Sequence, residues 1–212
     1  MTATGVRSVP SARRPSLALK RAMDVVGAAV GLLLAAPLLA VLAVAIKLDS
    51  RGPVLFRQWR IGRGGRPFRI VKLRTMVPDA ERLQDALRAG SRDPGWLLLG
   101  EDPRVTRLGR RLRRTSLDEL PQLWNVLRGQ MSLVGPRPLI ASEDAQLTGW
   151  QRTRTELKPG LTGLWQTLGR TQIPFEQMLE LDHLYVTTWS ARGDVRLLLR
   201  TVPVVLSRRG AN

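Results

Sequence analysis

The 212-residue sequence contains no cysteine and only one histidine, His183. The absence of cysteine excludes disulfide scaffolds, thiolate zinc sites and cysteine nucleophiles. A single histidine restricts Ser-His-Asp chemistry to that residue, and no G-x-S-x-G motif surrounds a serine. We therefore expect His183 to be a packed or surface residue. Aromatic residues are also scarce: phenylalanine and tyrosine number four together and the six tryptophans are scattered, which is unfavourable for a protein that stacks nucleic-acid bases.

Acidic residues are few as well: 34 basic residues stand against 17 acidic ones, a formal net charge of +17. An excess of this size indicates an anionic partner, which is nucleic acid, an anionic membrane surface or a phosphorylated substrate. The charge is uneven, because residues 1–75 carry 14 basic side chains and only two acidic ones.

Within that basic part lies an uncharged run of 22 residues, residues 25–46. It exceeds the roughly 18 residues that indicate a membrane helix. Basic residues flank it on both sides, and the positive-inside rule places both flanks on the cytoplasmic face. Pro37 lies near its middle, where it kinks a helix. Spanning helices also tolerate proline, but the two features together favour a re-entrant membrane helix-hairpin kinked at Pro37. The flanking residues are Arg13, Arg14, Lys20, Arg21, Lys47, Arg51, Arg57 and Arg60.

Beyond the run, residues 54–61 and 66–74 are rich in β-forming side chains, and Gly62-Arg63-Gly64-Gly65 separates them. The glycines match no phosphate-binding loop motif, so a β-hairpin turn is favoured. Residues 79–89 have the apolar spacing of a helix.

Residues 104–114 place Val105, Leu108 and Leu112 on one side of a helix that carries six arginines. The pattern is typical of a helix in a membrane interface. A basic helix covering the core and a helix in a nucleic-acid groove remain alternatives. Residues 194–206 repeat the pattern. We expect an α+β, mainly helical chain in three parts: a disordered basic tail (1–18), the re-entrant membrane helix (19–48) and a cytosol-facing catalytic domain (49–212), with a small β-hairpin and amphipathic interfacial helices around its core.

Asp118 and Glu119 are adjacent carboxylates that follow the arginine-rich segment. Ser116 and Glu119 fit an S-x-x-E capping box, although Pro121 would then lie inside the helix, so the helix can instead begin near Pro121. The alternative is catalysis, because one carboxylate can attack phosphorus while a second holds Mg²⁺. Nearby arginines would neutralise charge in phosphoryl transfer, and Pro136 and Pro138 give Arg137 a rigid mount for a phosphate.

These residues closely resemble the bacterial sugar transferases, the monotopic polyprenyl-phosphate phosphoglycosyl transferases, in their short form. The resemblance covers about residues 19–205, and the block from Ser116 to Pro138 is specific by itself. The other matching segments are Lys20-Arg21 with Asp24, the proline-kinked run, Gly52-Pro53-Val54, Phe56-Arg57-Gln58, Gly62, residues 72–76, Asp102-Pro103-Arg104, residues 158–166, Gly169-Arg170, and Asp182 with Tyr185.

The resemblance implies an enzyme that moves a sugar 1-phosphate from a UDP-sugar to polyprenyl (undecaprenyl) phosphate and releases UMP. It would initiate exopolysaccharide, capsule, O-antigen or glycoconjugate assembly. Asp118 would be the nucleophile of a covalent phosphosugar intermediate, and Glu119 would ligate Mg²⁺ and assist acid-base steps. Arg113 and Arg137 would contact phosphates. The remaining implied site residues are Lys72, Arg74, Pro136 and Pro138.

The implied location is the cytoplasmic (inner) membrane of a bacterium, with a monotopic topology and the active site on the cytosolic face. The partners would be the UDP-sugar, the polyprenyl phosphate and an anionic membrane, without nucleic acid; a homo-oligomer is compatible with the sequence. One departure is Ala36 before Pro37, where the family has serine. The sequence leaves open the sugar, the glycan pathway and the alternative of a noncatalytic membrane-anchored assembly protein.

Overall fold

The computed structural model describes residues 14–87, 90–91, 93, 95, 97, 99, 102–169 and 173–206. Residues 1–13 of the predicted tail lie outside this set, and residues 14–18 belong to the first helix instead. The fold is mainly helical with two small two-stranded sheets, as the sequence predicts for its class.

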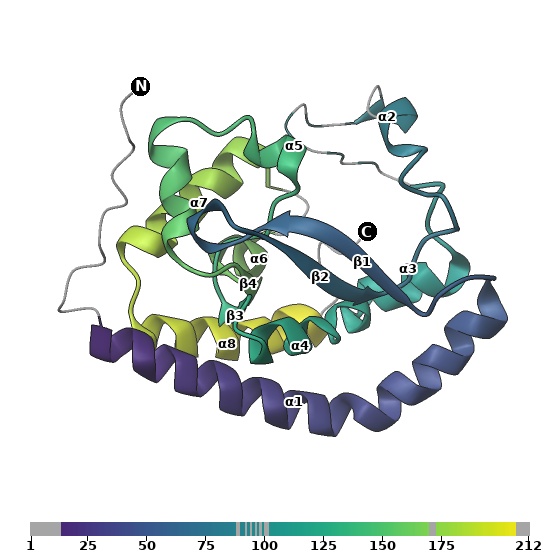
Figure 1. Cartoon of the computed structure of the whole chain (residues 1–212), viewed down its shortest axis with the longest axis horizontal. Coiled ribbons are helices and arrows are strands. Elements are labelled where there is room, and N and C mark those ends of the chain that lie inside the picture. The colour runs from purple at the N-terminus through teal and green to yellow at the C-terminus, as the bar shows by residue number, and fades with distance from the viewer. Residues whose placement is uncertain are drawn as a thin grey trace.

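Helix α1 (Arg14–Asp49) is unbroken and contains Pro37, and Figure 1 shows it curving beneath the rest of the molecule. The predicted kink does not divide it into two helices, because a proline removes one backbone hydrogen bond and a long helix tolerates that loss. By length and composition α1 could cross a membrane. Leu33 and Leu34 are 76% and 75% exposed, so its outer side presents a large apolar surface.

The inner side of α1 lies very close to its neighbours at two glycines. A Cβ atom on Gly27 would lie 2.7 Å from Leu133, and one on Gly31 would lie 3.0 Å from Leu123. These two leucines pack with Ala28, which is fully buried, in a core that also contains Ile70. The small residues of the apolar run therefore let α1 dock on the domain.

A β-hairpin follows, with β1 (Leu55–Ile61) antiparallel to β2 (Pro67–Leu73) and a 3₁₀ turn, η2 (Arg63–Gly65), between them. Gly64 and Gly65 have positive φ angles of 65° and 75°, which favour glycine. The predicted hairpin is confirmed. The predicted helix over residues 79–89 is much shorter, because only α2 (Gln84–Leu87) forms among its described residues and Asp79 has a φ of 61°.

Helix α3 (Arg107–Arg114) begins after Thr106, whose side chain accepts a hydrogen bond from the Gly109 amide. Its apolar face packs inward, because Leu112 is 2% exposed and contacts the cluster of Ile46 and Leu73. The prediction that this face enters lipid is therefore wrong, and α3 is a basic helix that covers the core. The next elements are η4 (Leu117–Glu119) and α4 (Gln122–Leu127), which starts after Pro121.

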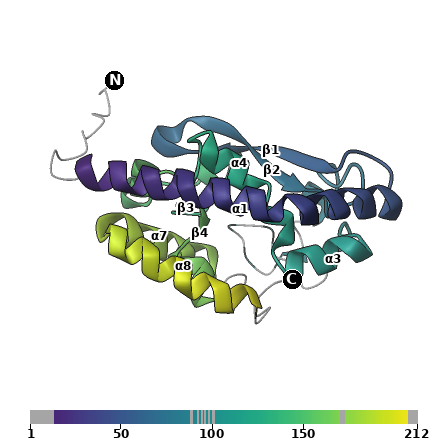
Figure 2. The ribbon, with the colours of Figure 1, turned by 90° about the horizontal axis from the view of Figure 1, so that it is seen from below.

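The C-terminal half contains a parallel pair of short strands, β3 (Ser132–Val134) and β4 (Gly160–Thr162). Helices surround the pair, and α8 lies beside α1 in Figure 2. Three apolar residues of α8, Val195, Leu199 and Val202, are exposed. Their contact with a membrane interface stays a prediction. The helical elements of this half are α5 (Ala141–Asp144), η5 (Gly149–Glu156), α6 (Leu164–Leu168), α7 (Phe175–Thr187) and α8 (Ala191–Leu206).

Candidate active site

Asp118 lies on the short turn η4 between the two helices α3 and α4. Ser116, which precedes this turn, has a left-handed backbone with φ 55° and makes no side-chain cap. The predicted capping box between Ser116 and Glu119 is therefore wrong; the Glu119 amide donates to the Ser116 carbonyl oxygen at 3.2 Å. A left-handed conformation costs a non-glycine residue about 1 kcal/mol, and such strain is common at functional sites.

The Asp118 carboxyl group is buried, with 6% of the residue exposed. Burial raises the pKa of Asp118 to about 6, while the positive charges of Lys72 and Arg113 oppose the rise and the negative charge of Glu119 adds to it. The site therefore holds a carboxylate with little water around it and cations nearby, which is the setting that activates a nucleophile at neutral pH.

Glu119 points to the neighbouring strand β2. Its Oε1 atom lies 2.6 Å from Nζ of Lys72, and both side chains are partly exposed, at 33% for Glu119 and 25% for Lys72. Lys72 thus lies next to both carboxylates of η4. The structure brings together Lys72, Asp118 and Glu119, all of which the sequence predicts as site residues.

Arg113 reaches the same region from the end of α3. Its Nε donates to Oγ1 of Thr75 at 3.0 Å. Burial lowers the pKa of Arg113, and the charge of Asp118 acts in the opposite direction. Thr75 lies tightly against α3, since a Cβ atom on Gly109 would lie 2.0 Å from the Thr75 carbonyl oxygen. The contact fixes the helix end that carries Arg113.

Arg74 has a different position from that of Lys72. Its guanidinium is buried and donates to the carbonyl oxygens of Arg51 at 2.7 Å and Ser50 at 2.6 Å, at the C-terminal end of α1. Cations stabilise helix C-termini, where carbonyl groups lack partners. The geometry gives Arg74 a structural role in holding α1.

Arg137 lies between Pro136 and Pro138, and two buried residues hold its backbone. Asp182 accepts a hydrogen bond from its amide at 3.3 Å, and Arg154 donates to its carbonyl at 2.5 Å. Asp182 and Arg154 are themselves paired at 2.5 Å, with 1% and 4% of their side chains exposed. The guanidinium of Arg137 lies 5.0 Å from the ring centroid of Trp165.

Pro136 and Pro138 also contribute through their carbonyl groups. Pro136 accepts from the amide of Gly160 at 2.9 Å, and Pro138 accepts from Nη1 of Arg60 at 3.0 Å. The proline carbonyls therefore connect the Arg137 segment to β4 and to the hairpin.

Arg60 is a residue of this region whose position the sequence did not indicate. Burial and the positive charge of Arg137 lower the pKa of Arg60 to about 10, and Glu143 and Glu119 act in the opposite direction. Arg60, Arg137 and Glu119 thus lie within electrostatic reach of one another. The sequence predicts Arg60 as part of a membrane flank. Arg60 lies opposite Phe68 near the turn of the hairpin, and no sequence motif distinguishes a residue of this site from a residue of a membrane flank.

The residues present are compatible with Mg²⁺. The described residues contain no cluster of three His, Cys, Asp or Glu side chains suited to a metal. Mg²⁺ commonly takes only one or two carboxylates and completes its shell with water and substrate phosphates. Glu119 beside Asp118 can provide such a partial site, since its side chain is partly exposed.

The comparisons with known proteins all point to sugar transferases or exopolysaccharide production. The family model described as bacterial sugar transferase matches residues 15–208. The chain is 47% identical over 201 residues to the UDP-glucose:undecaprenyl-phosphate glucose-1-phosphate transferase of Caulobacter vibrioides, which covers 91% of this chain and 71% of that protein. It is 38% identical over 201 residues to the exopolysaccharide production protein ExoY of Rhizobium meliloti, which covers 91% of this chain and 87% of that protein.

A third relative is the galactosyl transferase CpsE of Streptococcus agalactiae, which is 43% identical over 197 residues, or 92% of this chain and 44% of that protein. The chain spans less than half the length of several such relatives. The match with the family model extends from α1 into the residues beyond α8 and includes the whole candidate site. The chain belongs to the bacterial sugar transferase family.

Proposed function

We propose that this chain is a phosphoglycosyl transferase that moves a sugar 1-phosphate from a UDP-sugar to polyprenyl phosphate. The observation that carries the proposal is the buried Asp118 carboxylate, whose pKa is raised to about 6 beside Lys72, Glu119 and Arg113. The name of the Caulobacter vibrioides relative specifies UDP-glucose and undecaprenyl phosphate. It supports a UDP-sugar as the donor and a polyprenyl phosphate as the acceptor.

In the first step, an Asp118 carboxylate oxygen attacks the phosphorus that bears the sugar. The bond from this phosphorus to the bridging oxygen breaks, and UMP leaves with that oxygen. A covalent aspartyl-phosphosugar remains. Arg113 and Arg137 would bind the phosphates of the donor, and Lys72 would offset negative charge next to Asp118.

In the second step, a phosphate oxygen of polyprenyl phosphate attacks the same phosphorus. The bond to Asp118 breaks, the carboxylate is restored, and polyprenyl-diphosphate-sugar is the product. Glu119 would hold Mg²⁺, which would supply positive charge to the substrate phosphates. A covalent intermediate lets a soluble donor and a lipid acceptor use one site in turn.

We further propose that α1 is a re-entrant membrane helix with both ends on the cytosolic face of the bacterial inner membrane. Its N-terminal part binds the domain through Lys20, which pairs with Asp194 at 2.6 Å, and Asp24, which accepts from Ser132 at 2.9 Å. Its C-terminal end binds the same domain through Arg74. Because both ends of α1 are attached to the same domain, both should lie on the same side of the membrane, which a straight span does not allow.

The topology can be tested with single cysteines, since the native chain has none. Ser16→Cys and Arg51→Cys should both react with an impermeant maleimide only in inside-out vesicles. Reaction from opposite sides would show that α1 spans.

The activity can be tested with purified protein in detergent, Mg²⁺ and undecaprenyl phosphate, using a panel of UDP-sugars. One or a few donors should release UMP. The absence of UMP with every UDP-sugar would refute the proposal, and a product of UDP in place of UMP would indicate simple glycosyl transfer.

A further inference from the structure

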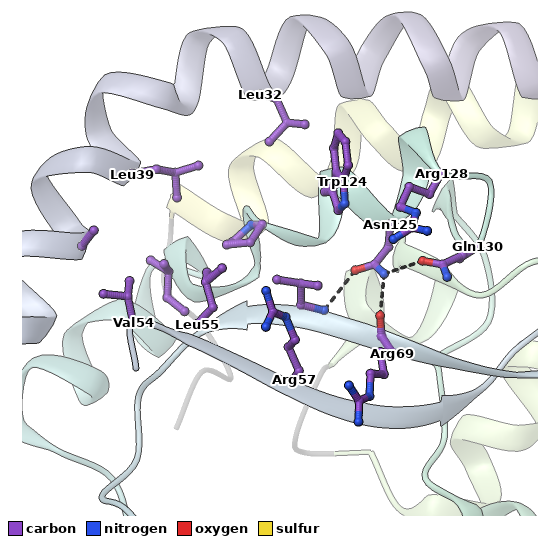
Figure 3. A pocket seen from close by; sticks show the side chains of 14 residues that line it. Leu32, Leu39, Val54, Leu55, Arg57, Arg69, Trp124, Asn125, Arg128 and Gln130 are labelled. Atoms are coloured by element: carbon purple, nitrogen blue, oxygen red, sulfur yellow. Dashed lines mark hydrogen bonds between the residues drawn. The ribbon is translucent and has the colours of Figure 1, made fainter. Parts of the chain in front are cut away.

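The β-hairpin has two different faces, because side chains alternate along a strand. Every second residue of β1 and β2 lines a cavity between the hairpin, α1 and α4, as Figure 3 shows. These lining residues are Leu55, Arg57, Arg69, Val71 and Leu73. Arg60 and Lys72 alternate with them and share the other face, where Lys72 contacts Glu119 at 2.6 Å. The face that carries Lys72 to the carboxylates of η4 therefore also carries Arg60.

Arg60 lies against the segment that contains Arg137. The amide of the next residue, Ile61, donates to the carbonyl oxygen of Leu139 at 2.8 Å, and the two residues form an antiparallel bridge. Arg60 itself donates from Nη1 to the Pro138 carbonyl at 3.0 Å. The charge of Arg137 reaches the Arg60 guanidinium and helps to lower its pKa. Two arginines that are distant in the sequence thus lie in one region of the site, and we call them the arginine pair.

The charge of Arg60 is largely buried and has no carboxylate within hydrogen-bond distance among the described residues. Only 15% of its side chain is exposed. Its hydrogen-bond acceptors are neutral, namely the Pro138 carbonyl and Oε1 of Gln58 at 2.6 Å. Oε2 of Glu143 lies 3.9 Å from Nη1 and instead accepts from the Ile140 amide at 3.1 Å. Nε of Arg60 is buried and has no hydrogen-bond partner in the described part of the chain.

This arrangement suits a phosphate. A buried cation without a close counter-ion, beside a second cation, carries an electrostatic cost. A phosphate bound by the arginine pair removes this cost, because guanidinium groups donate charge-assisted hydrogen bonds to phosphate oxygens. The Nε–H group of Arg60 provides one such donor.

The charges of the site also indicate which phosphate would bind there. The charged groups that act most on Asp118 are Lys72, Glu119 and Arg113. The charge of Glu119 also acts on Arg60. The phosphorus that Asp118 attacks would therefore lie beside Lys72 and Arg113. The other phosphate of the diphosphate, which leaves as UMP, would lie towards the arginine pair.

We propose that Arg60 binds the phosphate of the UMP part of the donor together with Arg137. Negative charge develops on this phosphate when the bond to the bridging oxygen breaks, and a guanidinium placed there stabilises it. The inference rests on the proposed function. It adds a phosphate-binding residue to those that the sequence implies.

Binding of UMP and of uridine separates phosphate recognition from a structural role. Calorimetry on the full chain in detergent with Mg²⁺ measures both affinities. Arg60→Gln should bind UMP about tenfold to a hundredfold more weakly, because charge-assisted hydrogen bonds are lost. Its affinity for uridine should equal that of the wild type. Arg66→Gln removes an exposed arginine at the turn of the same hairpin and should bind both ligands as the wild type does.

Kinetics provide a second readout. With a UDP-sugar and no acceptor, the UMP burst of Arg60→Gln should be about a hundredfold slower than that of the wild type. The KM for undecaprenyl phosphate should be unchanged. Arg60→Lys keeps the charge without the planar fork, so it should recover part of the UMP affinity.

A UMP affinity of Arg60→Gln within twofold of that of Arg66→Gln would overturn the proposal. Equal losses of UMP and uridine affinity would also overturn it, since Arg60 would then only hold the Pro138 segment. So would a higher KM for undecaprenyl phosphate with unchanged UMP binding, because Arg60 would then bind the lipid phosphate. A wild type that releases no UMP from any UDP-sugar would instead refute the proposed function, so the two failures can be distinguished.

Discussion

Lys72 lies 2.6 Å from Glu119, and its charge also acts on the buried carboxyl group of Asp118. One ammonium group thus acts on two carboxylates to which we assign different roles. A strand residue and a helix-connecting turn meet here because β2 packs beside η4. The relation makes Lys72 a residue whose removal should affect the ionisation of Asp118.

Lys72→Gln should move the pH dependence of the UMP burst to higher pH. Lys72 lowers the pKa of Asp118, which is about 6 in its presence, so the pKa should rise when this charge is lost. A pKa about one unit higher would lower the ionised fraction of Asp118 at pH 6 from about one half to about one tenth, so the burst rate at pH 6 should fall about fivefold. Stopped-flow or quench measurements from pH 5 to 8 would check this. An unchanged profile would contradict the influence of Lys72 on Asp118.

Asp118→Asn should stabilise the metal-free protein above pH 6. A raised pKa means that the folded state disfavours the ionised carboxyl group, so its contribution to stability is present below pH 4 and is lost as the pH rises through about 6. Asparagine does not ionise, so the variant does not lose stability in this pH range. Between pH 4 and pH 6, the free energy of unfolding of the variant should rise by on the order of 2–3 kcal/mol relative to that of the wild type.

Urea unfolding at pH 4, 5, 6 and 7 measures this difference. A pH-independent difference between the two proteins would show that Asp118 keeps an ordinary pKa. If Asp118→Asn is stable, the loss of its activity can be attributed to the missing carboxylate and not to unfolding.

Asp182→Asn should weaken donor binding through the backbone of Arg137. Asp182 contacts both the Arg137 amide and the Arg154 guanidinium, so its loss leaves a buried cation unpaired. We expect the free energy of unfolding to fall by about 3 kcal/mol. The KM for the UDP-sugar should rise severalfold, with the acceptor KM unchanged. Glu180→Gln, which changes an exposed carboxylate of α7, is the matched control. An unchanged donor KM would exclude a positioning role.

Arg74→Gln should reduce stability without changing substrate affinity. Its guanidinium binds the carbonyl groups that end α1. Loss of these buried charge-assisted bonds should lower the free energy of unfolding by about 2 kcal/mol. Denaturation and steady-state kinetics together test this. A higher donor or acceptor KM with unchanged stability would instead support the phosphate contact that the sequence suggests.

Local patterns were sufficient to predict the hairpin, because Gly62–Gly65 separates two β-rich segments and each strand needs only its neighbour. The same holds for the start of α4 at Pro121. The apolar run predicted α1, but the sequence did not show that Lys20 and Asp24 bind within the domain. Flanking charges look alike whether they face lipid headgroups or a buried Asp194.

Long-range contacts explain what the sequence did not predict. The strands β3 and β4 have three residues each and pair across more than 20 residues of intervening chain. Asn125 replaces a strand at the edge of β2 through its side chain alone. The Asp182–Arg154 pair that holds Arg137 has no local motif. For Asp118, the sequence left capping and catalysis open. The structure lacks the side-chain cap at Ser116, and the burial of Asp118 beside charged groups supports our proposal that it is catalytic.

The central claim is that Asp118 forms a covalent phosphosugar. Intact-protein mass spectrometry after incubation with the active UDP-sugar and Mg²⁺, without acceptor, tests it most directly. We predict a mass increase of one sugar phosphate, located on the peptide that contains Asp118 and absent in Asp118→Asn. Undecaprenyl phosphate should remove it. UMP release by Asp118→Asn at the wild-type rate, or an adduct on a different residue, would contradict the claim.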